Sequence, residues 1–324
     1  MSGDLQQRLL NGERRALARA ITLIESQLSQ HQKKAEQLIN GTLEYSGRSL
    51  RIGISGSPGV GKSTFIERFG LSMIEREHKV AVLAVDPSSQ KTKGSILGDK
   101  TRMQNLSVHD ASFIRPSPAG TTLGGVARRT RESILLCEAS GYDLIIVETV
   151  GVGQSETAVA SMVDLFIYLQ LPGAGDDLQG IKKGILELTN LILINKADGK
   201  NINLAKRAKV DLDLALNLLY KNRPNEKPDV MLVSALEGDG FAELLNKIEQ
   251  LEDHLHKDGL LEKQRGKQAG SWFDAETKEL AFESLMGKPN SDKTYDKLRR
   301  AVLSRELSPS SAARQFLNEV YASD

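Results

Sequence analysis

The sequence contains almost no cysteine and almost no net charge. Cys137 is the only cysteine among 324 residues, so the chain cannot form an internal disulfide, which suits a reducing compartment. The chain has 43 Lys and Arg residues and 42 Asp and Glu residues, which leaves a formal net charge of +1. This balance gives no electrostatic reason to expect a nucleic acid or an acidic membrane surface as a partner. Any partner is therefore expected to be a protein.

Long apolar runs are also missing. Residues 1–19 contain no apolar stretch of the length that a signal peptide needs, and nowhere do about 20 apolar residues run together as a membrane span requires. We therefore expect a cytoplasmic protein with no membrane partner. With 40% hydrophobic and 26% charged residues, a chain of this length fits one large domain with additions.

A glycine-rich segment follows the first apolar run, residues 50–54. A strand before such a segment and a helix after it are the context of a phosphate-binding P-loop. Its glycines let successive backbone N–H groups turn toward phosphate oxygens, and the helix adds the positive end of its dipole. We expect Lys62 to reach the β- and γ-phosphates and Ser63 to hold Mg²⁺. The predicted phosphate-binding residues are Gly56, Ser57, Pro58, Gly59, Val60, Gly61, Lys62, Ser63 and Thr64.

Two later segments, each at the end of an apolar strand, predict the base. In the segment 195–198, the Asp198 carboxylate can accept hydrogen bonds from both guanine N1–H and the exocyclic amine. Adenine presents an acceptor at N1 and would leave the carboxylate unpaired, so the segment favours GTP over ATP. Backbone N–H groups of residues 234–236 are expected to bind guanine O6. The predicted base-binding residues are Asn195, Lys196, Asp198, Ser234, Ala235 and Leu236.

Two further strands end at the acidic residues Asp86 and Glu148. In P-loop enzymes such a residue positions Mg²⁺ or its waters, and a glycine three residues later donates its N–H to the γ-phosphate. Glu148 and Gly151 fit these roles, whereas a local Asx-Pro turn remains an alternative for Asp86. Val152 stands where many regulatory GTPases have a water-orienting glutamine, so slow intrinsic hydrolysis is expected. The predicted catalytic residues are Lys62, Asp86, Glu148 and Gly151.

Apolar strands alternate with helical segments over residues 48–256. Continuous apolar strands separated by helices indicate an α/β fold, with a mainly parallel sheet that helices cover and a ligand crevice at the carboxyl ends of the strands. Residues 1–47 are predicted to form a helical extension with Leu17, Ile21, Ile24 and Leu28 on one apolar face. Residues 257–324 form a second helical extension, in which Ser308 is the expected cap of a last helix beginning at Pro309.

Five segments, residues 12–20, 85–89, 94–103, 148–156 and 175–184, carry a resemblance to a known family. They closely resemble the ArgK/MeaB-type GTPases associated with methylmalonyl-CoA mutase, which are P-loop G-proteins of the SIMIBI class, and the resemblance covers essentially the whole chain. It implies a homodimeric GTPase that binds GTP and GDP with Mg²⁺. It also implies a chaperone that gates adenosylcobalamin loading and protects or reactivates its client, an adenosylcobalamin-dependent acyl-CoA mutase. Methylmalonyl-CoA mutase is the expected client, with isobutyryl-CoA or a related mutase as the alternative.

The resemblance also assigns roles to residues of this chain. The magnesium region is implied to contain Ser63, Asp86, Asp99 and Glu148. Residues 171–183 are similar to an additional switch that communicates with the mutase, and residues 257–324 correspond to a dimerisation arm. Residues 90–93 depart from the family pattern and add two positive charges beside the first switch. The residues expected to couple the switch to the partner are Asp176, Asp177, Gln179, Lys182 and Lys183.

Other functions compete with this interpretation. A nickel-inserting metallochaperone GTPase shares the fold but should show closely spaced Cys or His ligands. The histidines are scattered except for His254 and His256, and two residues that are two apart on a helix point to different sides. A transport ATPase or arginine kinase conflicts with Asp198. A small-molecule kinase would need a lid over its acceptor, and the sequence offers no such segment.

Overall fold

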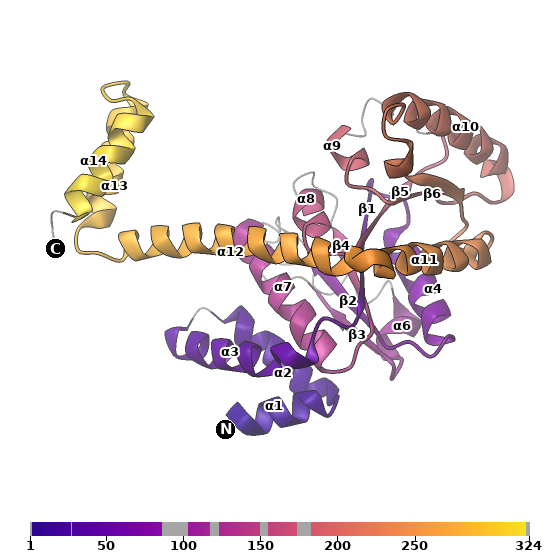
Figure 1. Cartoon of the computed structure of the whole chain (residues 1–324), viewed down its shortest axis with the longest axis horizontal. Helices are drawn as coiled ribbons and strands as arrows, with labels where there is room; N and C mark the ends of the chain where they lie inside the picture. The colour runs from indigo at the N-terminus through magenta and orange to yellow at the C-terminus, as the bar shows by residue number, and fades with distance from the viewer. Residues whose placement is uncertain are drawn as a thin grey trace. The chain divides into compact units, whose positions relative to one another are not determined.

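The computed structural model describes residues 2–26, 28–85, 103–116, 123–149, 155–173 and 183–321. The chain divides into two compact units, Met1–Arg265 and Gly266–Asp324. Figure 1 shows the strands and most of the helices in the first unit. Some predicted site residues lie outside the described residues, namely Asp86, Asp99, Gly151, Asp176, Asp177, Gln179 and Lys182. For Lys183 only the backbone is described.

Within the described residues, seven strands form one parallel sheet in the order β3-β2-β4-β1-β5-β6-β7. Strand β1 lies in the middle, and its Ile54 is opposite Glu148 of β4 and Ile167 of β5. The prediction of a mainly parallel sheet is therefore confirmed. The strands are β1 (Leu50–Gly56), β2 (Val80–Val85), β3 (Ser112–Arg115), β4 (Leu144–Thr149), β5 (Leu165–Gln170), β6 (Leu191–Ile194) and β7 (Asp229–Leu232).

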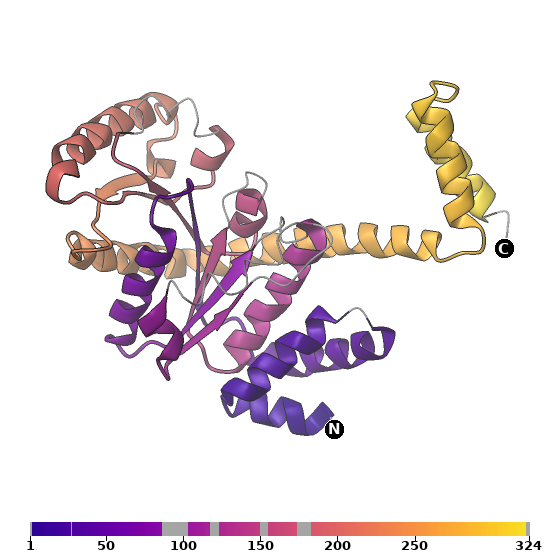
Figure 2. The same ribbon diagram turned by 180° about the vertical axis from the view of Figure 1, so that it is seen from behind.

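Helices cover both faces of this sheet (Figures 1 and 2). Along β2, Val80 and Val82 pack with one set of helices, while Ala81 and Leu83 pack with the other. Burial on both faces explains why the strands are continuously apolar. The first set is α4 (Lys62–Ile74), α6 (Gln104–Val108) and α11 (Phe241–His256). The second includes α2 (Arg14–Glu25), α7 (Leu123–Ala139) and α8 (Ser155–Ala160), while α9 (Lys183–Leu186) and α10 (Ile202–Leu219) pack on β6 and β7.

The N-terminal extension consists of the helices α1 (Ser2–Leu10), α2 and α3 (Ser29–Thr42). Leu17, Ile21 and Ile24 are buried in the same core cluster as the sheet residues Ala81 and Ile145, so the extension is part of the first unit's core. The prediction that Leu28 shares one apolar helix face with Leu17, Ile21 and Ile24 was wrong. Helix α2 ends at Glu25, and Leu28 precedes α3 with 63% of its surface exposed.

The second unit contains most of α12 (Leu260–Met286), together with α13 (Ser291–Leu303) and α14 (Pro309–Tyr321). Tyr295 of α13 meets Phe316 of α14 edge-on, with ring centroids 5.5 Å apart. The predicted helix start is confirmed, because the Ser308 hydroxyl accepts a hydrogen bond of 3.2 Å from the Ser311 N–H at the start of α14. Every helix among the described residues is too short or too polar to cross a bilayer.

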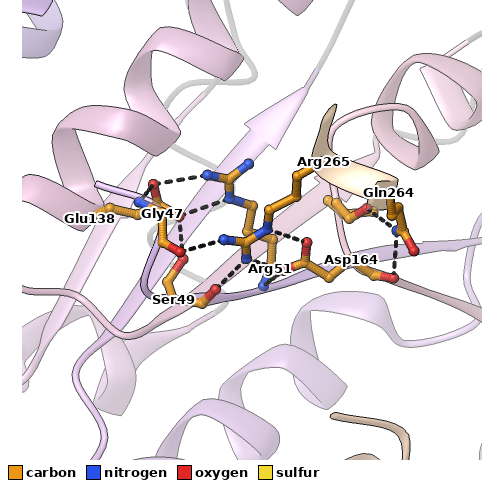
Figure 3. Close-up of polar contacts among 8 residues, drawn as sticks. Gly47, Ser49, Arg51, Glu138, Asp164, Gln264 and Arg265 are labelled. Carbon is orange, nitrogen blue, oxygen red and sulfur yellow. Dashed lines mark hydrogen bonds and ion pairs between the residues drawn. The ribbon is translucent and has the colours of Figure 1, made fainter. Parts of the chain in front are cut away.

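A buried ion pair joins Arg51, on β1, to Glu138 at the end of α7 (Figure 3). Arg51 donates two hydrogen bonds of 2.8 and 2.9 Å to the Glu138 carboxylate, whose side chain is only 1% exposed. The Ser49 hydroxyl and the Gly47 N–H donate to the same carboxylate. Burial alone would raise the pKa of Glu138, but Arg51, Ser49 and Gly47 together hold that pKa below its ordinary value.

A second pair lies beside it, at the amino-terminal end of β5. Arg265 donates bonds of 2.8 and 2.6 Å to Asp164, and further bonds of 2.6 Å to the carbonyls of Gly47 and Ser49. The Asp164 side chain is fully buried. Figure 3 shows both arginines reaching into one polar cluster, which we call the Arg51–Arg265 cluster. It stabilises the edge of the sheet opposite to the carboxyl ends of the strands.

We expect Glu138→Gln to lower the free energy of unfolding by about 3–5 kcal/mol at pH 7, because it leaves Arg51 buried without its counter-charge. The folded-state pKa of Glu138 is lowered, so its contribution is present above the unfolded value of about 4.3 and is lost as pH falls through the lower folded value. Urea titrations of the wild type and the variant from neutral pH down to about pH 3 measure this effect. The difference between their free energies of unfolding should become smaller below about pH 4.3. A difference that stays constant would contradict this assignment.

Candidate functional site

The loop after β1 has the backbone that its glycines predict. Gly61 precedes α4 with a φ of 91°, in the left-handed region that L-residues avoid. A Cβ added to Gly56 would lie 2.4 Å from the carbonyl oxygen of Leu169 on the neighbouring strand β5. Only glycine fits there without displacing the backbone of β5. Helix α4 therefore begins at Lys62 with its first N–H groups turned toward the loop.

Lys62 lies folded into this loop. Its Nζ donates a hydrogen bond of 2.8 Å to the Gly56 carbonyl and a longer one of 3.5 Å to the Ser57 carbonyl. Burial lowers the pKa of Lys62, while the negative charges of Glu148 and Glu156 oppose that shift. Neutral carbonyls are weaker acceptors for an ammonium group than charged phosphate oxygens. The side chain is thus held by partners that an incoming phosphate can replace.

Asn195, which follows β6, is buried and uses both ends of its amide inside the protein. Its Nδ2 donates a bond of 2.8 Å to the Val60 carbonyl in the P-loop, and its Oδ1 accepts a bond of 3.1 Å from the Ala235 N–H. Next to it, Lys196 has a φ of 58° and extends its Nζ to the Gly59 carbonyl at 2.8 Å. These bonds connect the loops after β1, β6 and β7 into one site.

Asp198 is half-buried beside the loop after β7. The Ser234 hydroxyl donates a hydrogen bond of 2.5 Å to its Oδ2 and so holds the orientation of the carboxylate. In the part of the chain that the structure describes, the second oxygen has no hydrogen-bonding partner. The carboxylate is therefore oriented, with one oxygen available to a ligand.

The loop of residues 234–236 has already used two of its three backbone donors. The Ser234 N–H binds the Asp239 carbonyl at 2.9 Å, and the Ala235 N–H binds Asn195. From α4, Arg68 donates to the Ala235 carbonyl at 2.7 Å and to the Leu236 carbonyl at 2.6 Å. In a trans peptide the N–H points opposite to the preceding carbonyl, so the Leu236 N–H points away from Arg68. Within the part of the chain that the structure describes, Leu236 is therefore the member of this loop whose N–H remains available.

Oxygen-bearing side chains lie where β1 and β4 end. Glu148, the penultimate residue of β4, is buried, and the Thr149 hydroxyl donates a bond of 2.8 Å to the Ser55 hydroxyl on β1. Ser63 lies in the first turn of α4. Mg²⁺ is usually bound through one or two carboxylates together with phosphate oxygens and water, so the Ser63 hydroxyl and the Glu148 carboxylate fit that ion.

The sequence profile of the family described as "Methylmalonyl Co-A mutase-associated GTPase MeaB" matches residues 17–290, which is well over half of the chain. The chain belongs to this family. The predicted resemblance is therefore confirmed. As a MeaB-family member, the protein is a P-loop enzyme that hydrolyses GTP, so the predicted GTPase activity is confirmed, while the roles of the segments around Lys62 and Asp198 stay predictions.

Relatives of this MeaB-family chain cover nearly all of it. "GTPase ArgK" of Escherichia coli is 48% identical over 309 residues, which are 95% of this chain and 93% of that protein. "Methylmalonic aciduria type A homolog, mitochondrial" of Mus musculus is 44% identical over 319 residues, with coverages of 95% and 77%. A solved structure described as "LAO/AO transport system kinase" has a TM-score of 0.78 and 40% identity, and covers 99% of this chain and 97% of its own.

Sequence reasoning missed two residues of the candidate site. Arg68 orients the loop of residues 234–236 through contacts more than 160 positions away in the chain, and a helical arginine gives no sign of such a role. Glu156 stands in one of the segments that carry the family resemblance, but its burial beside the phosphate end of the sheet is visible only in the structure.

Proposed function

We propose that this GTPase is the chaperone of an adenosylcobalamin-dependent acyl-CoA mutase, with methylmalonyl-CoA mutase as its client. In this proposal GTP hydrolysis to GDP and phosphate gates adenosylcobalamin loading and protects or reactivates the mutase. The observation that carries the proposal is the match to a mutase-associated GTPase family over residues 17–290. The mouse relative's name, which refers to methylmalonic aciduria, supports the same client.

Guanine binds, in this proposal, between the loops after β6 and β7. The available oxygen of Asp198 accepts from guanine N1–H or the exocyclic amine, and Oδ2 shares its acceptor capacity with the Ser234 hydroxyl. The Leu236 N–H donates to guanine O6. Asn195 contributes by holding the P-loop against Ala235. Adenine would leave the Asp198 carboxylate without hydrogen-bond donors, which supports selection of GTP over ATP.

The phosphates bind over the loop after β1. Lys62 exchanges the Gly56 and Ser57 carbonyls for β- and γ-phosphate oxygens. Mg²⁺, when bound, offsets the negative charge that develops on the transferred phosphoryl group. The residues proposed to hold it are Ser63, Asp86, Asp99 and Glu148, and the Gly151 N–H is proposed to donate to the γ-phosphate.

We further propose that a homodimer forms through residues 257–324 and that the mutase accelerates hydrolysis. Val152 cannot orient a water molecule, so the isolated protein should turn over slowly. A partner can repair such a deficit by ordering a switch or by supplying charge. The residues proposed to sense the partner are Asp176, Asp177, Gln179, Lys182 and Lys183.

This proposal predicts slow GTP turnover by the isolated protein and an acceleration of about tenfold or more by its mutase. Asp177→Ala and Lys182→Ala should reduce the acceleration more than the basal rate, because they alter the sensing segment and leave the nucleotide contacts in place. The measurement is phosphate release with and without methylmalonyl-CoA mutase, together with a binding assay for each variant. Lys33→Ala, at an exposed position on α3, is the matched control.

Two results would count against the proposal. If neither methylmalonyl-CoA nor isobutyryl-CoA mutase changes the rate of a protein that binds GTP, neither enzyme is the client. If the two variants bind the mutase and are stimulated as strongly as Lys33→Ala, the segment does not couple the sites. Stimulation by isobutyryl-CoA mutase alone would identify that enzyme as the client.

A further inference from the structure

Four carboxylates are buried in the part of the chain that the structure describes: Glu138, Glu148, Glu156 and Asp164, each no more than 6% exposed. Glu138 and Asp164 are paired with arginines in the Arg51–Arg265 cluster, and Glu148 also has an interaction partner. Glu156 differs, because its Oε2 is buried and has no hydrogen-bond partner there. Leaving a buried polar atom unsatisfied costs about 1–3 kcal/mol, and more for a charged group. A native protein that keeps such an atom is expected to use it, for example to bind a water molecule or a ligand.

Glu156 lies at the nucleotide end of the sheet. It is the second residue of α8, which packs against β1 and β4. Strand β1 leads into the P-loop, and β4 ends at Glu148 and Thr149. The negative charge of Glu156 acts on the Lys62 ammonium together with that of Glu148. Among the described residues, Glu156 is therefore a carboxylate that acts electrostatically on Lys62 and whose Oε2 has no hydrogen-bond donor.

Two other buried oxygens that have no hydrogen-bond partner among the described residues lie near the same edge of the sheet. They are Ser155 Oγ, beside Glu156 on α8, and Gln170 Oε1, at the carboxyl end of β5. The Gln170 main chain is firmly held, since its carbonyl accepts a bond of 2.9 Å from the Asn195 N–H. Unsatisfied polar atoms around one edge indicate a place where polar ligands are expected.

The missing partner of Glu156 must be a hydrogen-bond donor. Phosphate oxygens are themselves acceptors and carry negative charge, so they would repel the carboxylate. Water donates hydrogen bonds, and GTP hydrolysis would bring it to this edge in two forms, as the nucleophile and as a ligand of Mg²⁺. We propose that Glu156 is a further residue of the hydrolytic site, whose Oε2 accepts a hydrogen bond from a water molecule held beside the bound GTP.

Val152 offers no acceptor to an attacking water, whereas the Glu156 carboxylate does, and the partner is still needed to order the switch or to supply charge. Glu156 orients the water and forms no bond to phosphorus. The inference rests on the proposed position of the γ-phosphate beside Lys62. The two candidate water molecules affect different quantities. A water that acts as the nucleophile affects the rate of the chemical step, whereas a water bound to Mg²⁺ affects the affinity of the protein for the ion.

The test uses the full chain with Glu156→Gln, and Glu138→Gln as the matched control. Both positions are glutamates that are 6% exposed, but Glu138 is paired and lies at the opposite edge of the sheet. Glu156→Gln should leave the thermal midpoint unchanged or raise it, since it removes a buried charge whose Oε2 has no hydrogen-bond donor among the described residues. Its single-turnover GTP hydrolysis should fall by about tenfold or more. Glu138→Gln should lower the midpoint and leave hydrolysis by the folded protein unchanged.

Titration of Mg²⁺ with a fluorescent, non-hydrolysable GTP analogue distinguishes the two waters without measuring activity. An unchanged Mg²⁺ midpoint together with a slower single turnover identifies the nucleophile. A Mg²⁺ midpoint raised by about fivefold or more identifies a water bound to the ion. Glu156→Asp, which withdraws the carboxylate by one methylene group, should change the same quantity as Glu156→Gln and provides a second variant.

Two results would overturn the inference. In the first, both Glu156 variants hydrolyse GTP and bind Mg²⁺ like the wild type. In the second, they lose stability as Glu138→Gln does while the folded fraction keeps its full rate, which indicates a structural carboxylate. A wild-type protein that fails to bind GTP with Mg²⁺ would refute the proposed nucleotide site as well. The failure of Glu156 alone is therefore distinguishable from the failure of the site.

Discussion

Asp198→Asn is expected to weaken GTP binding by about a thousandfold or more, because the proposed site reads guanine through buried hydrogen bonds that the amide cannot reproduce. The Ser234 hydroxyl already holds the Asp198 Oδ2 at 2.5 Å, so the side chain cannot turn freely to accommodate the change. The amide of the variant presents N–H donors to the N1–H and the exocyclic amine of guanine, and two donors cannot form a hydrogen bond with each other. Xanthine carries a carbonyl in place of the amine, so relative affinity for xanthosine triphosphate should rise.

Equilibrium titration with GTP and xanthosine triphosphate measures both effects on the same protein. Asp211→Asn is the matched control, since it makes the same chemical change at an exposed position on α10. The control should bind GTP like the wild type. If Asp198→Asn also binds GTP with unchanged affinity, the base does not contact this carboxylate.

Lys62→Ala is expected to abolish GTP hydrolysis, with a loss of about a thousandfold or more in rate, while the protein stays folded. The ammonium is the proposed counter-charge for the β- and γ-phosphates, and no shorter side chain can reach them. In the structure its hydrogen bonds go to the Gly56 and Ser57 carbonyls, which belong to the same loop. Its removal should therefore change the free energy of unfolding by only about 1 kcal/mol.

Phosphate release and thermal unfolding, measured on the same preparation, test this expectation. Lys79→Ala removes an exposed lysine next to β2 and should behave like the wild type in both assays. An unfolded Lys62→Ala protein would mean that the lysine supports the loop as well as the phosphates. If Lys62→Ala hydrolyses GTP as fast as Lys79→Ala does, the phosphates do not bind at Lys62.

The sheet could be predicted closely from the sequence because its strands are short apolar runs buried on both faces. The continuously apolar residues 80–85 and 191–194 coincide with the strands β2 and β6. Helix ends were harder to predict. Leu28 continues the spacing of α2, yet the helix stops at Glu25 and Leu28 is exposed. Spacing records which face a residue would occupy if the helix continued, and it carries little information on where the helix ends.

The segments of the candidate site could be recognised in the sequence, but their hydrogen bonds could not be predicted from it. Asn195 and Ser234 stand in recognisable segments, yet the pattern does not reveal that the Asn195 amide is fully engaged by the protein. Nor does it reveal that Arg68 fixes the peptide planes that leave the Leu236 donor available. These features depend on contacts between distant parts of the chain. A local motif does not specify which acceptor pairs with a given donor in the folded protein.

The Arg51–Arg265 cluster has a consequence for the order in which the protein is made. Asp164 is fully buried, and Arg265, which pairs with it, is synthesised 101 positions later. While the ribosome is still adding the residues between them, β1 and β5 can pair, but Asp164 has no cation to offset its burial. A nascent chain at that stage, or a fragment that stops before Arg265, would bear a cost of about 3–5 kcal/mol for that charge. The first unit thus becomes fully stable only when the beginning of α12 has been synthesised.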